Sequence, residues 1–242
     1  MSEGNGYLGI KSNHTPRIGE RIRFGTQNGK KFEWKVLDVQ DNKAFLVCES
    51  IICNMPYHNP GGFTTWKDCL LRKWLNETFL QECFSSQERS IILSCNVVTE
   101  ADPERDTHET IITVDKIFLL SVKDAERLLL FLPESEELDD DELDDDELLV
   151  TNSWWLRTAG PSCFSSCIDY FGDIEVAGDF VDKNLGVRPV LWVNLDSEHL
   201  YEDGLFRHEI KTEPNKVLAE IDEKIAELEA RIARLKAEDN KS

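Results

Sequence analysis

The sequence has little of what membrane, secreted or nucleic-acid-binding proteins need. No apolar run, including Leu128–Leu132, approaches the length that spans a bilayer. The first residues lack a basic start followed by an apolar stretch, so we expect no secretory signal. Only 27 side chains are Lys or Arg, against 47 Asp and Glu, and phosphate binding depends on basic groups. We therefore expect no membrane partner and no nucleic-acid partner.

Common catalytic and cofactor signatures are also absent. The five histidines show no HExxH-type spacing, and no GxSxG elbow, P-loop or dinucleotide fingerprint occurs. The acidic run at 139–147 lacks the turn glycine and the ligand spacing of an EF-hand. We expect a protein that needs no cofactor and is not an enzyme, unless its cysteines carry chemistry.

Seven cysteines are present, an odd number. Without an export signal, they are best interpreted as reduced thiols of a cytoplasmic protein. Cys48, Cys53 and His58 could supply three metal ligands. Zinc sites, however, prefer a tighter pair followed by a second pair, so this spacing is a weak signal.

The net charge of −20 is concentrated in one segment. Residues 133–150 carry eleven acidic groups and no basic ones, whereas residues 1–132 carry 18 acidic and 16 basic groups. We predict that 134–149 is a solvated acidic insertion. It is either a spacer or an electrostatic handle for a basic partner. The residues of the handle would be Asp139, Asp140, Asp141, Asp144, Asp145 and Asp146.

Alternating apolar residues predict strands at the start of a domain that we expect over residues 15–210, after a flexible arm at 1–14. Ile18–Phe24 alternates, as do the apolar residues of Phe32–Val36, and Lys43–Cys48 is the expected partner strand. The domain thus begins with antiparallel strands.

Two helices are predicted next, followed by further strands. One apolar face runs from Leu70 to Phe79. Ser85 and Glu88 have the spacing of a capping box, which starts a second helix. The last predicted strand is Val187–Leu195.

Residues 214–238 predict a short coiled coil. The apolar residues are spaced 3, 4, 3, 4, 3 along the chain, as the a and d positions of a heptad repeat are. Position a is mostly Ile and position d is mostly Leu, a combination that favours a parallel two-stranded coiled coil. This seam would make the protein a homodimer; the alternative is a helix that packs on its own domain. The seam consists of Leu218, Ile221, Ile225, Leu228, Ile232 and Leu235.

Several short motifs follow one another in order. They are Trp34–Leu37, Thr65–Asn76, Val114–Ser121, Ser153–Arg157 and Gly186–Trp192. Together they resemble an uncharacterised bacterial domain family with WxVL, LRxWLN, WWLR and GxRP motifs, over roughly residues 15–196. That family is related to formylglycine-generating enzymes and to the variable domains of diversity-generating retroelements. The resemblance implies a C-type lectin-like α+β fold: two helices on a small twisted antiparallel sheet, with a long loop region that carries the binding face.

The expected binding face is the loop region 158–185 with its flanking aromatic residues. Trp155 and Arg157 could form an aromatic and guanidinium platform for a ligand. The alternative is structural, with the Trp in the core and the Arg bonded to loop carbonyls. The full set of ligand-binding candidates is Trp155, Arg157, Tyr170, Phe171, Asp173 and Asp179.

Cys163 and Cys167 lie four residues apart, ahead of Asn184–Arg188. This arrangement resembles the active region of copper-dependent formylglycine-generating enzymes, although the cysteine spacing differs by one. Soft thiolates select Cu(I), so the pair is also a weak candidate metal site. The alternatives are two reduced structural cysteines or a redox pair.

We interpret the chain as a non-catalytic recognition module. It would bind a basic protein, or another macromolecule, through the loop face beside the acidic insertion. One alternative is a copper-dependent oxidase of the formylglycine-generating type that uses Cys163 and Cys167. Another is a structural subunit of a phage or prophage particle.

Overall fold

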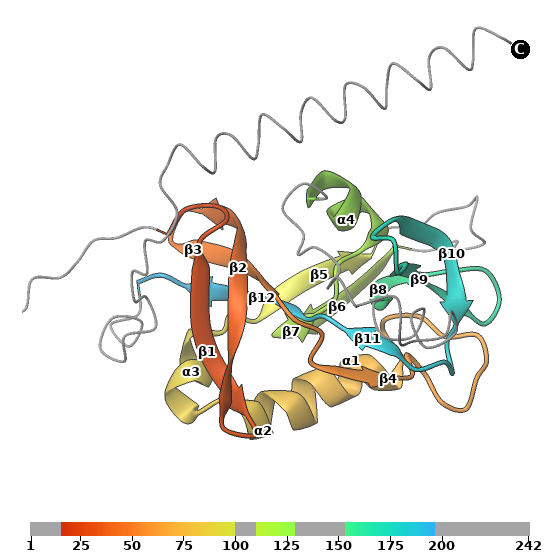
Figure 1. Cartoon of the computed structure of the whole chain (residues 1–242), viewed down its shortest axis with the longest axis horizontal. Coiled ribbons are helices and arrows are strands. Elements are labelled where there is room, and N and C mark those ends of the chain that lie inside the picture. Colours follow the sequence, from red (N-terminus) through yellow and green to blue (C-terminus); the bar gives the residue numbers. More distant parts are fainter. Residues whose placement is uncertain (1–15, 100–109, 129–152, 197–242) are drawn as a thin grey trace, which may run out of the picture. The chain divides into compact units, whose positions relative to one another are not determined.

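The computed structural model describes residues 16–99, 110–128 and 153–196 (Figure 1). The chain divides into two units, residues 1–206 and 207–242, and the second lies wholly outside the described residues. Three predicted segments lie outside them too. They are the arm 1–14, the acidic insertion 134–149 and the coiled coil 214–238.

The first sheet contains the antiparallel strands that the sequence predicted at the start of the domain. Its strands are β1 (Arg21–Gln27), β2 (Lys30–Gln40), β3 (Lys43–Cys48), β12 (Val190–Asn194) and β7 (Ile117–Phe118), in that spatial order. Ile22 and Phe24 are buried, and the exposed residues of β1 alternate with them. The turn between β1 and β2 uses Asn28 (φ 51°) and Gly29 (φ 78°), the pair of positive φ angles that a tight hairpin favours.

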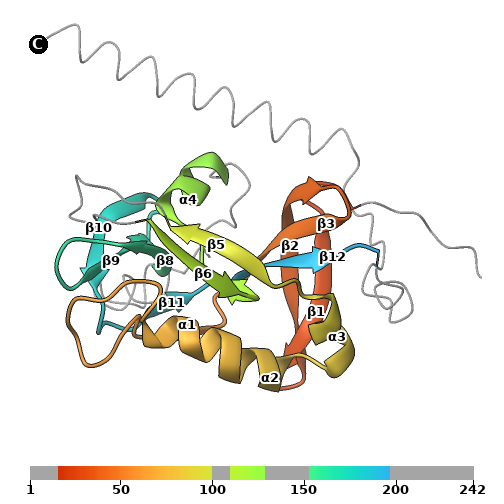
Figure 2. The same cartoon turned by 180° about the vertical axis from the view of Figure 1, so that it is seen from behind.

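A second five-stranded sheet forms the other end of the domain (Figures 1 and 2). Its order is β10 (Ile174–Phe180), β9 (Phe164–Ile168), β8 (Trp154–Ala159), β11 (Leu185–Val187) and β4 (Cys53–Met55). A separate ribbon pairs β5 (Cys95–Thr99) with β6 (Ile111–Asp115). Three sheets therefore surround the core.

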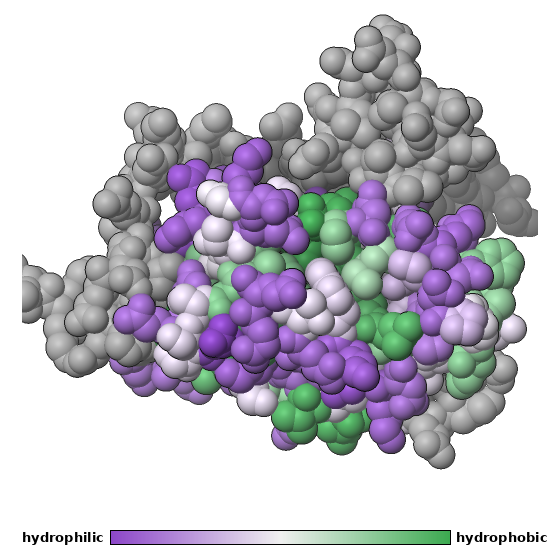
Figure 3. All heavy atoms as spheres, turned by 90° about the horizontal axis from the view of Figure 1, so that it is seen from below, coloured by the Kyte–Doolittle hydropathy of each residue, from purple (hydrophilic) through white to green (hydrophobic). Residues whose placement is uncertain are grey.

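The helices are short. α1 (Leu70–Trp74), η1 (Leu75–Phe79) and α2 (Leu80–Cys83) follow one another directly, and α3 (Ser86–Ile91) and α4 (Val122–Leu128) stand apart. The predicted capping box at the start of α3 is confirmed. Figure 3 looks onto the side of the domain where α1 and α2 run, and this side is mostly hydrophilic with small separate hydrophobic groups.

The expected lectin-like α+β fold is wrong. Both predicted helices occur, but strands dominate the described chain and form three sheets rather than one small sheet. The region 158–185, predicted as a long loop, contains β9, β10 and the start of β11. The reason is burial: all six residues of β8 are buried, so neither β8 nor its neighbours show the alternation that marks a half-exposed strand.

Large aromatic side chains fill the core between the elements. Trp34, Trp66, Trp155 and Tyr57 are its largest fully buried side chains. Each indole has a partner for its N–H, as buried Trp requires; that of Trp66 donates to the Asp115 carboxylate at 2.9 Å. Within the described part of the chain, no helix has the length and apolar character needed to cross a membrane.

Candidate functional site

Two predicted binding residues, Trp155 and Arg157, lie in the core. Trp155 is fully buried and its Nε1 donates to the Met55 carbonyl at 3.0 Å. Arg157 is 4% exposed. They therefore do not form a platform on the surface; their strand, β8, pairs with β9 inside the second sheet.

Arg157, on β8, joins its strand to three other parts of the chain. Its Nη1 donates to the Leu119 carbonyl at 2.7 Å and to the Asp124 carboxylate at 2.6 Å. Its Nη2 donates to the Val98 carbonyl at 2.8 Å, and its Nε to the Thr99 hydroxyl at 3.2 Å. The guanidinium thus donates to buried acceptors of β5, of α4 and of the segment before α4. This arrangement is that of a structural arginine, not of a ligand-binding one.

Asp124 receives this cation at the start of α4. Its Oδ2 also accepts from the backbone N–H and the hydroxyl of Ser121, at 3.1 and 2.8 Å. Burial alone would raise the pKa of Asp124, but the Arg157 guanidinium and the Ser121 donors outweigh it and lower that pKa. The carboxylate is therefore ionised at neutral pH.

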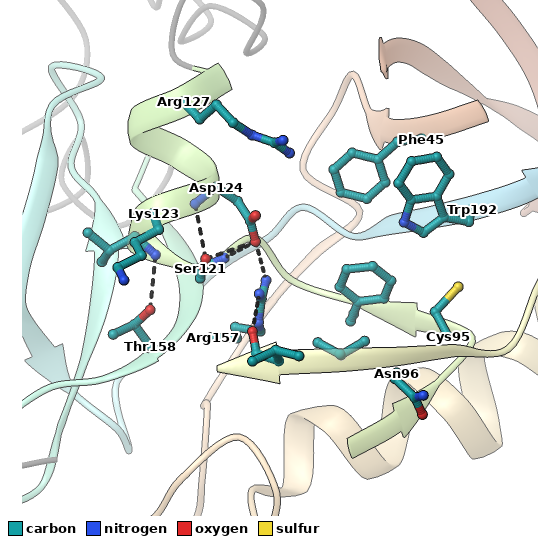
Figure 4. Close-up of a pocket in the computed structure, with 14 residues that line it drawn as sticks. Phe45, Cys95, Asn96, Ser121, Lys123, Asp124, Arg127, Arg157, Thr158 and Trp192 are labelled. Carbon is teal, nitrogen blue, oxygen red and sulfur yellow. Dashed lines mark hydrogen bonds and ion pairs between the residues drawn. The ribbon is translucent and has the colours of Figure 1, made fainter. Parts of the chain in front are cut away.

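A cavity of about 310 Å³ lies beside this ion pair (Figure 4). It forms where α4, β5 and β8 meet three strands of the first sheet. Phe45, Phe118 and Trp192 supply an aromatic wall: the Phe45 ring stacks on Trp192 at 4.9 Å and on Phe118 at 5.9 Å between centroids. The cavity thus combines a flat apolar wall with a charged one.

Sequence reasoning missed this cavity. In the sequence, Ser121 and Asp124 have only the spacing of a helix cap, and they do form one at the start of α4. A capping carboxylate has the same local pattern whether or not a distant arginine contacts it. Only the pairing of strands far apart in the sequence brings Asp124 to Arg157, so no spacing rule could have found the site.

The other predicted binding residues lie on the β9–β10 hairpin. Tyr170 and Phe171 occupy its turn with ring centroids 4.0 Å apart, and Phe171 is 72% exposed. Asp173 is exposed beside them, and Asp179 lies on β10. Tyr170, Phe171 and Asp173 therefore lie at the turn of the hairpin, and Asp179 lies toward its other end, paired with Ser165.

The hairpin is acidic and its turn is held in place. Residues 163–183 carry five carboxylates and a single basic group, Lys183. The Asp169 side chain accepts from the backbone N–H groups of Phe171 and Asp173, at 3.0 and 2.8 Å. This Asx arrangement orders the turn, so the exposed aromatic ring projects from a defined backbone.

The cysteine pair lies on the same hairpin. Cys163 precedes β9 and Cys167 is buried within it, and all seven cysteines of the chain are free thiols. Burial, together with the carboxylates of Asp179 and Glu175, raises the pKa of Cys167 to about 12. A thiol with this pKa is protonated at neutral pH, the form that is neither nucleophile nor metal ligand.

The three sequence candidates for a metal site are divided between elements. Cys48 ends β3, Cys53 begins β4 in the other sheet, and His58 follows in a loop. Among the described residues, no group of three or more His, Cys, Asp or Glu side chains is arranged to hold a metal ion. The proposed acidic handle and the coiled-coil seam lie outside those residues.

One comparison with known proteins gives a match. The model of a family described as a domain of unknown function (DUF6273) matches residues 41–195, well over half of the chain. No curated protein and no solved structure matches the chain. The matched region runs from the turn before β3 to the end of β12, so it contains both the cavity and the hairpin.

Proposed function

The chain belongs to the DUF6273 family, and from its geometry we propose that it is a non-catalytic recognition module that binds a basic protein segment on the β9–β10 hairpin. One observation carries this proposal. An ordered turn presents an exposed aromatic side chain, Phe171, amid a strong local excess of carboxylates. Binding surfaces combine aromatic anchors with complementary charge in this way.

The position of β10 supports a strand-like partner. Among the described strands, β10 has a neighbour on one side only. An edge strand offers unpaired backbone donors and acceptors, to which an extended segment can add. Phe180, 45% exposed and 4.3 Å from the Phe164 ring, lies at the end of β10 and provides a second apolar contact.

The carboxylates of the hairpin would select a basic partner. Glu175 and Asp179 face the same side of the hairpin, because they pair with Cys167 and Ser165 and alternate residues of a strand share a face. Lysine or arginine side chains of an added strand would meet Glu175 directly and would compete with Lys183 for Asp179, which Lys183 contacts at 2.9 Å. Long-range attraction of this kind raises the association rate and weakens with salt.

A synthetic peptide of alternating lysine and valine tests the proposal. We compare the double variant Glu175→Gln/Asp179→Asn with the control Asp41→Asn/Asp68→Asn, which removes two exposed carboxylates elsewhere. Isothermal titration at low salt is expected to show about fivefold weaker binding for the hairpin variant, as for loss of a partly exposed ion pair. The control should change affinity by less than about twofold. Equal losses in both variants, or no binding by the unmodified chain, would contradict the proposal.

We also propose a cytoplasmic location. The support is the state of the cysteines, because all seven thiols are free and reduced thiols are typical of that compartment. Thiol trapping in intact cells measures this: all seven cysteines should react after denaturation without prior reduction, and blocked cysteines would contradict it.

A further inference from the structure

The cavity beside Arg157 has the size of a small-molecule site. Its volume of about 310 Å³ is at the lower end of the range for ligand pockets. Elements from all three sheets and α4 contribute to its walls. A site assembled from so many buried elements has a preformed shape, which reduces the entropy lost on binding.

The aromatic wall favours a flat apolar group. Figure 4 shows the Phe45 and Trp192 rings side by side on one side of the cavity, across from α4. Phe45 is buried and Trp192 half-buried. Lys43 places its Nζ 4.8 Å from the centroid of the Trp192 ring and helps to hold that ring in place. A second ring in the cavity would add to the existing stack.

The opposite wall is cationic. Arg157 and Asp124 neutralise each other at 2.6 Å. Lys123 and Arg127 of α4 also line the cavity and are exposed. Arg127 has no hydrogen-bond or ion-pair partner among the described residues, and in Figure 4 its guanidinium extends from α4 across the cavity toward Phe45. Among the described residues, Arg127 is therefore a cation at the cavity whose charge is not neutralised by an ion pair.

From these observations, we propose that the cavity binds a small carboxylate with an aromatic body, with the ring against Phe45 and Trp192 and the carboxylate on Arg127. Arg157 is a positioning residue: its donors are taken by Asp124 and by buried carbonyls, so it orients α4 rather than contacting the ligand. This site is separate from the hairpin, and its failure would leave the proposed protein-binding surface untouched.

Three probes of nearly equal shape test the charge preference: phenylacetate, phenylacetamide and phenethylamine. Titration calorimetry on the full chain should give the tightest binding for phenylacetate, because only its charge complements Arg127. The amide should bind more weakly and the amine weakest of all. Equal affinity for the three compounds would overturn the proposal, and so would no binding of phenylacetate at about 10 mM, roughly tenfold above a millimolar Kd.

Two variants test the residues. Arg127→Gln should weaken phenylacetate binding about three- to fivefold without changing the affinity for phenylacetamide. Arg17→Gln removes another exposed guanidinium, outside the cavity, and should change neither the affinity for phenylacetate nor that for phenylacetamide. Trp192→Leu should weaken both ligands, since it removes the aromatic wall. If Arg127→Gln and Arg17→Gln have equal effects, Arg127 does not hold the carboxylate and the proposal fails, even if Trp192→Leu does not fold.

Discussion

A single buried guanidinium connects the elements around the cavity. Arg157 donates to carbonyl groups of β5 and of the segment before α4, and to the carboxylate at the start of α4. Buried carbonyls without donors cost free energy, and a buried carboxylate without a cation costs more. The position of α4 against β8 therefore depends on Arg157.

Replacing Arg157 by Met should lower the free energy of unfolding by about 3 kcal/mol, because Asp124 would stay partly buried without its cation. Urea denaturation measures this loss. The double variant Arg157→Met/Asp124→Leu is expected to lose less than the two single variants combined, since their effects share one ion pair. Strict additivity would show that the two groups are not coupled.

Asp124 also predicts a pH dependence. Its pKa in the folded state lies below the ordinary value of 3.8. The group therefore stabilises the fold above that ordinary value, and the contribution is lost as the pH falls through the lowered folded pKa. The difference in unfolding free energy between the unmodified chain and Asp124→Asn should be constant from pH 5 to 7 and shrink below about pH 4. A difference that does not change with pH would contradict the lowered pKa.

At the scale of elements, local patterns predicted the hairpin strands and the caps. β2 was predicted because its apolar and charged residues alternate, and β3 because it follows β2 across a turn. The cap at Ser85 was predicted because it is a contact within one helical turn. β9 and β10 were missed as strands. Four of five β9 residues are buried, so β9 shows no period-two alternation. β10 alternates only over its first five residues, because its register shifts between Glu175 and Asp179.

The candidate site was predictable only in part for the same reason. Tyr170, Phe171, Asp173 and Asp179 are close in the sequence, and all four lie on a single hairpin. The contact between Arg157 and Asp124 depends on long-range pairing. No local pattern records such a contact.

The bulge in β10 depends on Gly178. Its φ of +70° is in the left-handed region, and a Cβ there would overlap the Ser165 carbonyl oxygen. Gly172 has φ +86° but open space around it. Gly172→Ala should therefore cost about 1 kcal/mol of unfolding free energy from backbone strain alone. Gly178→Ala should cost at least 2 kcal/mol more because of the steric overlap. Thermal unfolding of both variants measures the difference, and equal losses would show that the hairpin can shift.

At the scale of the whole molecule, acidic residues are concentrated in two stretches of the sequence, the insertion 134–149 and the β9–β10 hairpin. The sequence places the insertion 134–149 between α4 and β8, and the β9–β10 hairpin follows β8 directly. If the insertion steers a basic partner, deleting 134–149 should slow association with the lysine–valine peptide and flatten its salt dependence. Stopped-flow rates at several salt concentrations test this. Unchanged association rates would indicate that the insertion is a spacer and not an electrostatic handle.

Hydrogen–deuterium exchange with and without the lysine–valine peptide locates the recognition surface on the domain. If the peptide adds to the edge strand, amides of β10 and of the turn at Tyr170 and Phe171 should gain protection. Amides of β1 and β2, at the other end of the domain (Figure 1), should not change. Protection confined to β1 and β2, or none under saturating peptide, would contradict the assignment of the hairpin as the recognition surface.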